Sequence, residues 1–216
     1  GAACLTGSDN DAIAALPETA GRPNQFVISL VDAHYYVHQG FAVSGGELVR
    51  IGSRQSVTPN DYADAITQQT AAVVYFLGSQ PDDELGAIVE IAHARNVPVI
   101  VDAAAQLPPR SNLTDLATKV GADLVVFSGG KGLFGPQASG LILGRADLVE
   151  AARLNSSPFS GIGRGMKVAS MKKNMEPKKS IRSTPSSDSG TYGKICGPRE
   201  AAADTLTERT KRTQRV

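Results

Sequence analysis

Residues 122–144 read ADLVVFSGGKGLFGPQASGLILG, and this stretch decides the fold. It contains an apolar strand at residues 124–127, a glycine-rich turn that carries Lys131 between two glycines, and a second strand at residues 140–144. The link GPQASG at 135–140 is too short for a crossover helix, so we expect the second strand to run antiparallel to the first. Glycines let the backbone approach a ligand closely. An amine that is kept from water there loses its proton more readily and becomes a nucleophile. The alternative is an exposed lysine in an ordinary turn.

Strands and helices alternate along the chain. Runs of β-branched and aromatic residues predict strands, and apolar residues at helical spacing predict helices. Thr58 and Pro59 are typical of a helix start, as N-cap and first helical residue. The expected strands are 26–31, 47–51, 71–77, 97–101, 124–127 and 141–143, and the expected helices are 58–68, 82–95, 113–120 and 146–154. This alternation predicts an α/β fold with a mostly parallel sheet and helices on both faces.

Asp102 ends a continuous apolar run, VPVIV at 97–101, which predicts a fully buried parallel strand. Ligands of open α/β sheets bind beyond the carboxyl ends of the strands, so we expect Asp102 and Lys131 at the same edge. A buried acid beside a loop lysine suggests a pyridoxal phosphate site, in which the lysine forms the Schiff base and the acid pairs with the pyridinium nitrogen. The alternative roles for Asp102 are a helix N-cap and a structural salt bridge.

Three segments resemble the fold-type I pyridoxal phosphate enzymes: DAAAQLPP at 102–109, GADLVVFSGGKGLFGPQASGLILGR at 121–145, and GIGRGMKV at 161–168. Within that class they are most similar to the selenocysteine synthase (L-seryl-tRNA selenium transferase)-related group that includes D-glucosaminate-6-phosphate ammonia-lyase. The opening GAACLTGSDNDAIAALP extends the resemblance to about residues 1–168. It implies an incomplete aspartate aminotransferase-like large domain that binds pyridoxal 5'-phosphate, with Lys131 and Asp102 as catalytic residues.

The resemblance also implies roles for other residues around the cofactor. Relatives often place a hydroxyl such as that of Ser128 near the cofactor phosphate, and a small or planar residue such as Ala104 beside the ring. Gln106 is expected to reach the ring hydroxyl or the substrate. His34, preferred over His38, is expected to stack on the ring. The alternatives are a plain turn serine and ordinary loop histidines.

Both ends of the chain depart from the pattern of the group. Gly1 and Ala2 match the start of a helix that in relatives binds the cofactor phosphate, so we expect the chain to be the middle of a longer enzyme. Arg164 is a candidate for binding a substrate anion, because a guanidinium fits carboxylate and phosphate groups. A salt bridge that joins domains is the alternative. After residue 168 the sequence changes abruptly, which suggests a frameshift or an aberrant end.

Composition and charge predict one globular domain at 1–168 and a basic, disordered tail at 169–216. Residues 167–216 carry twelve Lys or Arg against five Asp or Glu, and polar residues replace the apolar periodicity. The chain contains no apolar run long enough to span a membrane and no signal-peptide pattern. Cys4 and Cys196 lack metal-ligand or CxxC spacing, so we expect no metal site and a reduced, cytoplasmic compartment.

The sequence and its resemblance together predict a pyridoxal phosphate-dependent lyase or transferase that acts on an amino acid or amino sugar acid. Lys131 would remove the α-proton, Asp102 would stabilise the resulting carbanion through the cofactor, and the β-substituent would be eliminated or replaced. A site at a dimer interface, and hence a homo-oligomer, is also implied. The alternative is a truncated, non-catalytic domain whose basic tail binds nucleic acid or anions weakly. That tail has Tyr192 as its one aromatic residue and no recognised RNA-binding motif.

Overall fold

A computed structural model describes residues 1–32, 34–156 and 167–170. In chain order the elements are α1 (Ala2–Thr6), α2 (Asn10–Ala15), β1 (Gln25–Ser29), α3 (Tyr35–Val43), β2 (Glu47–Ile51), α4 (Pro59–Ala65), β3 (Thr70–Phe76), η1 (Asp82–Glu84, a 3₁₀ turn), α5 (Leu85–His93), β4 (Val99–Asp102), α6 (Asn112–Thr118), β5 (Leu124–Ser128), β6 (Ser139–Gly144), α7 (Ala146–Leu154) and β7 (Lys167–Ser170). None of the helices in these ranges is long and apolar enough to cross a membrane.

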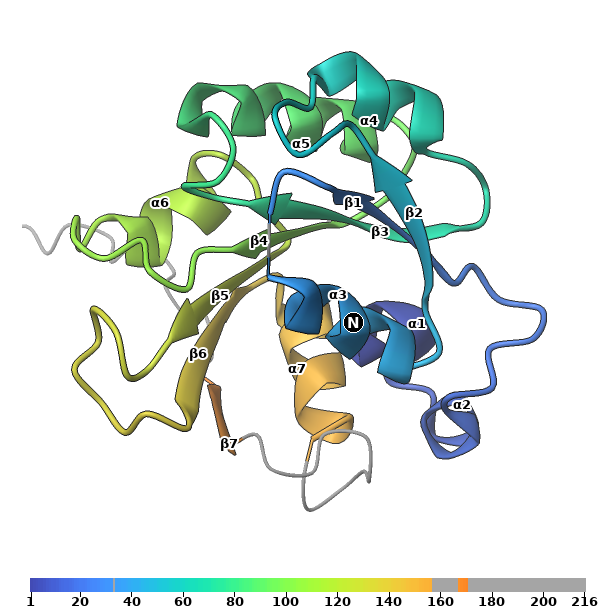
Figure 1. The fold of residues 1–216 in the computed structure, drawn as a ribbon. Coiled ribbons are helices and arrows are strands. Elements are labelled where there is room, and N and C mark those ends of the chain that lie inside the picture. The colour runs from blue at the N-terminus through green and yellow to red at the C-terminus, as the bar shows by residue number, and fades with distance from the viewer. Residues whose placement is uncertain (33, 157–166, 171–216) are drawn as a thin grey trace, which may run out of the picture. The chain divides into compact units, whose positions relative to one another are not determined.

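The described strands form one sheet in the order β2-β1-β3-β4-β5-β6-β7 (Figure 1). Neighbouring strands are parallel except β5 and β6, which pair antiparallel from Leu124 opposite Gly144 to Ser128 opposite Gly140. The predicted reversal after residue 128 is therefore confirmed. β3 is buried at every position, as expected for a central strand that is covered on both faces.

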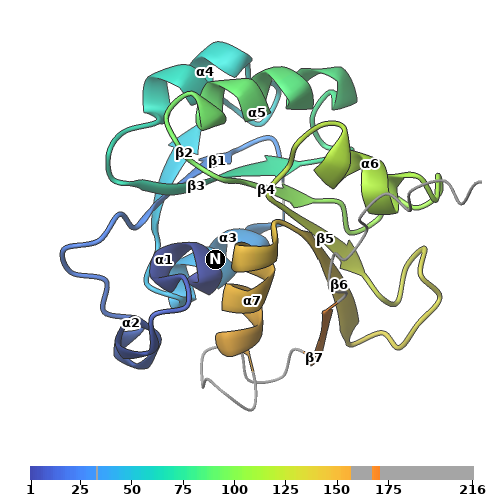
Figure 2. The same ribbon diagram turned by 180° about the vertical axis from the view of Figure 1, so that it is seen from behind.

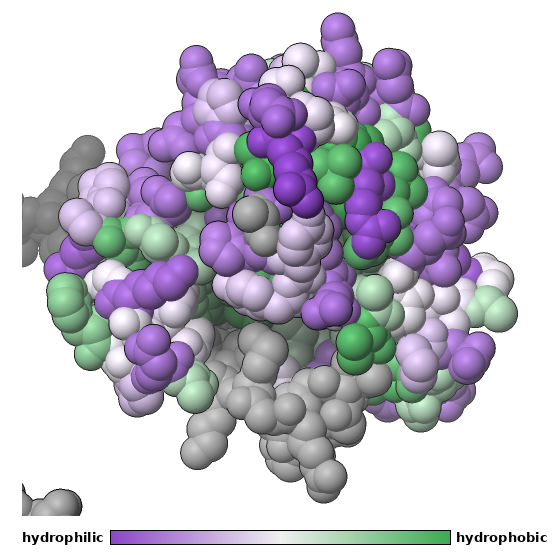
Figure 3. Space-filling model, in the orientation of Figure 1, coloured by the Kyte–Doolittle hydropathy of each residue, from purple (hydrophilic) through white to green (hydrophobic). Residues whose placement is uncertain are grey.

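Helices cover both faces of the sheet. α4, α5 and α6 lie on one face, and α1, α3 and α7 lie on the other (Figures 1 and 2). Successive residues of the central strands point to opposite faces, so the core divides into two clusters. Val27, Val73, Val99 and Val125 pack on the α4–α6 side, and Phe26, Val74, Ile100 and Leu124 pack on the α1–α3–α7 side. The outer surface over α4 and α5 is mostly hydrophilic (Figure 3).

The start of α4 follows the sequence prediction. The Thr58 hydroxyl oxygen accepts a hydrogen bond from the Asp61 backbone N–H at 3.4 Å, and the Asp61 carboxylate accepts one from the Thr58 N–H at 2.7 Å. This capping box satisfies two backbone donors that would otherwise lack a helical partner. The hydrogen bonds from Thr58 lower the pKa of Asp61.

The predicted fold class, α/β with a mostly parallel sheet and helices on both faces, is confirmed. Every expected strand and helix is present, with ends that differ by at most three residues. Three elements were not expected: α2, α3 and β7. β7 spans Lys167–Ser170, so the predicted domain boundary at residue 168 falls inside a strand. The predicted disordered tail lies outside the described residues, apart from the end of that strand.

Candidate functional site

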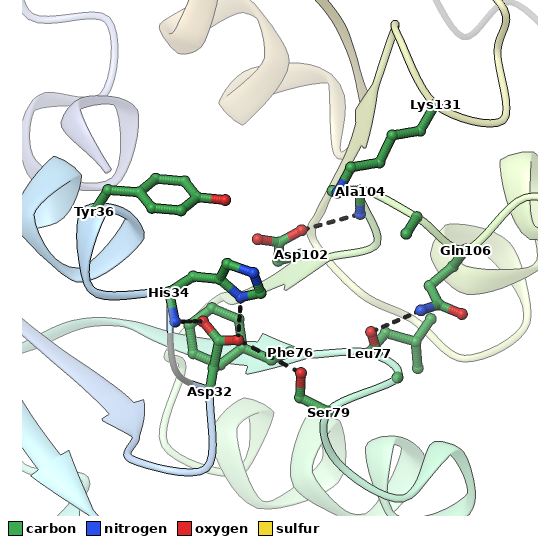
Figure 4. A pocket seen from close by; sticks show the side chains of 12 residues that line it. Asp32, His34, Tyr36, Phe76, Leu77, Ser79, Asp102, Ala104, Gln106 and Lys131 are labelled. Carbon is green, nitrogen blue, oxygen red and sulfur yellow. Dashed lines mark hydrogen bonds and ion pairs between the residues drawn. The ribbon is translucent and has the colours of Figure 1, made fainter.

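Two adjoining cavities lie at the edge of the sheet where β1, β3, β4 and β5 end. Their volumes are about 160 Å³ and about 360 Å³, and together they fall within the ~300–1,000 Å³ typical of small-molecule sites. Both cavities are lined by Tyr36, Asp102, Ala104 and Lys131. The smaller also contains Asp32, His34, Ser79 and Gln106 (Figure 4), and the larger is lined mainly by apolar residues and Ser128. The two cavities therefore meet at the predicted acid–lysine pair.

Asp102 is the last residue of β4 and is only partly buried. Its strand pairs with β5, and Asp102 lies opposite Val126. One carboxylate oxygen accepts the Ala104 backbone N–H at 3.0 Å. Among the described residues the other oxygen has no hydrogen-bond partner, and Asp102 forms no ion pair, so the salt-bridge alternative is not supported. This arrangement leaves one oxygen of a fixed carboxylate available to a ligand.

Lys131 belongs to the loop between β5 and β6. The loop is held by hydrogen bonds from Gly129 N–H to the Ser139 carbonyl and from Gly135 N–H to the Gly129 carbonyl, at 2.8 and 2.7 Å. The Lys131 side chain extends from the loop toward Ala104 and Asp102 (Figure 4). As a whole residue Lys131 is exposed, and it lines both cavities; that its amine is kept from water stays a prediction.

Gln106 lies in the loop that follows β4, and its side chain packs against a sharp turn at Gly78, just after β3. Gly78 has φ +88°, and a Cβ atom there would collide with the Gln106 amide nitrogen. Only glycine combines this backbone conformation with such a close approach. The Gln106 amide donates to the Leu77 carbonyl at 3.0 Å, so its nitrogen is already engaged while its side chain lines the smaller cavity.

Asp32 is a site residue that the sequence analysis missed. It lies between β1 and α3 and is 4% exposed. One carboxylate oxygen lies 2.6 Å from His34 Nδ1, and the other accepts the His34 backbone N–H at 3.1 Å. The Ser79 hydroxyl donates to Asp32 at 3.5 Å. The signal in the sequence was an acid two residues before a histidine, directly after a strand.

The two predicted histidines have different environments. His34 lines the smaller cavity, and Tyr36 packs edge-on against its ring at 5.5 Å between centroids. His38 is a helical residue of α3, 2% exposed, and stacks on Phe76 at 5.7 Å. Among the described residues neither ring nitrogen of His38 has a hydrogen-bond partner, and burial lowers the pKa of His38. The alternative view of His38 as a loop histidine is wrong, because the segment after His34 folds as a helix against the sheet.

The remaining predicted residues fall into three groups. Ser128 lines the larger cavity, and Ala104 lines both. Gly1 and Ala2 line neither of these two cavities; Gly1 precedes α1 and lies against Phe41 of α3 and Ser44, the residue that follows α3. Arg164 and the basic tail lie outside the described residues. The role of each of these residues stays a prediction.

The chemistry of the cavity fits pyridoxal phosphate. An available carboxylate oxygen of Asp102 suits a protonated ring nitrogen, and the Lys131 amine, which has no ion-pair or hydrogen-bond partner within the described ranges, suits an aldehyde. Ala104 leaves room for a flat ring between them, because its side chain is a single methyl group. Gly132 lets the lysine loop lie against the loop that follows β4, since a Cβ atom there would be 2.5 Å from the Leu107 carbonyl oxygen.

The parallel sheet, its reversal between β5 and β6, and the acid–lysine pair at its edge define the class of fold-type I pyridoxal phosphate-dependent enzymes. The solved structure of D-glucosaminate-6-phosphate ammonia-lyase is similar, with a TM-score of 0.64 and 30% sequence identity over 78% of this chain and 45% of that one. The family described as L-seryl-tRNA selenium transferase matches residues 34–176, and the chain belongs to this family.

Curated relatives agree with this assignment. The chain is 37% identical to a 5'-C-glycyluridine monooxygenase-decarboxylase from Streptomyces sp., over 77% of this chain and 42% of the relative. It is 32% identical to a D-glucosaminate-6-phosphate ammonia lyase from Salmonella typhimurium, over 81% of this chain and 46% of the relative. The chain thus spans less than half the length of these curated relatives. Members of the family use pyridoxal phosphate.

Proposed function

We propose that this chain is the cofactor-binding part of a pyridoxal phosphate-dependent lyase or transferase. Lys131 Nζ would bond the aldehyde carbon of the cofactor, and Asp102 would hold the protonated ring nitrogen. Ala104 would lie beside the ring, and the Ser128 hydroxyl would bind the phosphate. The cofactor supplies an electron sink for a carbanion at the substrate Cα. The observation that carries the proposal is that Asp102 and Lys131, from β4 and the β5–β6 loop, line the same two cavities.

The proposed reaction begins with removal of the substrate α-proton. Once the substrate amine has displaced it, the Lys131 amine is free to accept that proton. Asp102 would hold the ring in one orientation and would keep its nitrogen protonated. The β-substituent then leaves or is replaced. We propose an amino acid or amino sugar acid as substrate, because one relative is named for D-glucosaminate-6-phosphate and the family for a seryl-tRNA substrate.

We also propose that the chain acts as a homo-oligomer. Tyr36 lines both cavities and is 67% exposed, and its neighbour Tyr35 is 52% exposed. Phe134, in the loop of Lys131, is 94% exposed and has φ +52°, in the left-handed region that bulky residues rarely adopt. A second copy over these aromatic rings would also cover Lys131. A cytoplasmic location stays a prediction.

The test is to add pyridoxal phosphate to the purified chain and record the absorbance of the covalent adduct. Borohydride reduction followed by peptide mapping should place the label on Lys131. Lys131→Ala should lose both signals. Lys119→Ala is the matched control, because Lys119 is an exposed lysine that pairs with Asp115 at 2.9 Å and lines neither cavity. A folded parent without adduct, or a Lys131→Ala variant that keeps it, would contradict the proposal.

A further inference from the structure

Asp32 and His34 form a hydrogen-bonded acid–histidine pair whose place in the proposed reaction has not been assigned. The Asp32 carboxylate is buried, with a side-chain exposure of 3%, whereas the His34 side chain is 61% exposed. A buried carboxylate is costly unless it is paired and hydrogen-bonded. Its partners among the described residues are the His34 ring, the His34 backbone N–H and the Ser79 hydroxyl.

The contacts of Asp32 determine how the imidazole is presented. Nδ1 lies 2.6 Å from Asp32, and a carboxylate can only accept, so Nδ1 carries a hydrogen. The second bond, from the His34 backbone N–H, holds the carboxylate against the start of α3. Figure 4 shows the other ring nitrogen, Nε2, on the side of the ring that faces Asp102. Among the described residues Nε2 has no hydrogen-bond partner.

We infer that Asp32 is a positioning residue that keeps the hydrogen of His34 on Nδ1, and that Nε2 of His34 is the group that protonates the departing β-substituent. The inference rests on the proposed function for its chemistry. The hydrogen bond made by one ring nitrogen selects the tautomer, and a carboxylate on Nδ1 also stabilises the imidazolium. The pair therefore gives the site a proton donor distinct from Lys131.

The step balances without any further reagent. The Lys131 amine takes the α-proton, and the electrons of that C–H bond form the double bond between Cα and Cβ. The bond from Cβ to the substituent breaks, and the substituent leaves with the bonding pair and the proton from Nε2. His34 is then a neutral imidazole with its hydrogen on Nδ1, bonded to Asp32, and solvent reprotonates Nε2.

The first test needs neither cofactor nor substrate. Nitrogen NMR of the ¹⁵N-labelled imidazoles, at a pH where they are neutral, should show the Nδ1–H tautomer for His34, identified by its loss in His34→Gln. Asp32→Asn keeps the shape of the side chain but replaces one accepting carboxylate oxygen by a donating amide group. The hydrogen of the neutral His34 ring should therefore move from Nδ1 to Nε2. Ser79→Ala removes only the 3.5 Å contact and should keep the Nδ1–H tautomer. An Nε2–H tautomer of His34 in the parent chain would overturn the inference, as would an unchanged tautomer in Asp32→Asn.

The second test separates proton donation from a purely structural role. β-Chloroalanine releases chloride, which needs no proton, whereas serine must release hydroxide or water. The ratio of serine to β-chloroalanine elimination should fall by about 10²-fold in both His34→Gln and Asp32→Asn, the usual contribution of a positioned acid. An equal loss on both probes would refute the acid role. Failure of adduct formation at Lys131 would instead refute the proposed function, and it would leave the tautomer result standing.

Discussion

Replacing Gly132 by alanine should move the loop that carries Lys131 away from the loop that follows β4. The new Cβ atom would lie 2.5 Å from the Leu107 carbonyl oxygen and 2.6 Å from the Leu107 Cβ. Since Cβ atoms do not come closer than 3.0 Å to such neighbours, the loop must move by at least about 0.5 Å, and by about 1 Å to restore ordinary contact. The backbone carbonyl cannot rotate aside as the end of a flexible side chain could.

A displacement of this size has two consequences. Misplacing a reacting group by about 1 Å can cost about 10²-fold, so we expect adduct formation with pyridoxal phosphate to weaken by about 10–100-fold. Overpacking should lower the free energy of unfolding by about 1–3 kcal/mol. Absorbance titration with the cofactor measures the first effect, and denaturant unfolding measures the second.

Gly86→Ala is the matched control for this experiment. Gly86 lies in α5, and a Cβ atom there meets nothing within 4 Å. Because alanine is the better helix former, this variant should be more stable by about 0.5–1 kcal/mol and should bind the cofactor like the parent. A Gly132→Ala variant that matches the parent in both stability and adduct formation would refute the close-packing argument.

Three further changes test other parts of the structure. Thr58→Ala should destabilise the chain by about 1 kcal/mol in urea unfolding and let the pKa of Asp61 rise toward its ordinary value in a carboxyl NMR titration. Burial lowers the pKa of His38 below its unfolded value of about 6.5, so the unfolded chain binds more protons and stability is lost as the pH falls below about 6.5. The variant His38→Phe keeps an aromatic ring against Phe76 but has no group that titrates there. The melting temperature of this variant should therefore fall less steeply between about pH 7 and pH 5 than that of the parent. Asp123→Ala removes the buried acceptor of three hydrogen bonds and should cost about 3 kcal/mol, measured by urea unfolding.

The sheet and the acid–lysine pair could be predicted because each depends on a strong local signal. The apolar runs that became β3, β4 and β5 are buried between two layers of helices, so they lack the alternation of a half-exposed strand. Asp102 and Lys131 each follow such a run. The rule that parallel strands present their carboxyl ends at one edge then brings the two residues together without any knowledge of side-chain packing.

The parts that could not be predicted depend on tertiary contacts. α3 reads YYVHQGFAV, and its aromatic, β-branched and glycine residues are weak helix formers. It forms because Phe41 packs on Phe26 and His38 packs on Phe76 of the sheet. The link between Asp32 and His34 depends on the turn before this helix, so it was missed with the helix. The exposure of Lys131 likewise depends on which parts of the protein lie next to its loop, and the local sequence does not specify them.

The direct pairing of β4 with β5 has a consequence for how this site tolerates sequence change. The strand that ends in Asp102 and the strand that leads to Lys131 are neighbours, about 4.8 Å apart in any sheet, and main-chain hydrogen bonds set that spacing. Side chains on the outer helices can therefore diverge widely without altering the separation of acid and lysine. A one-residue insertion within β5 would turn every later side chain of that strand to the opposite face. In a library of variants the helix surfaces should thus accept most substitutions, while the length of β5 should hardly vary.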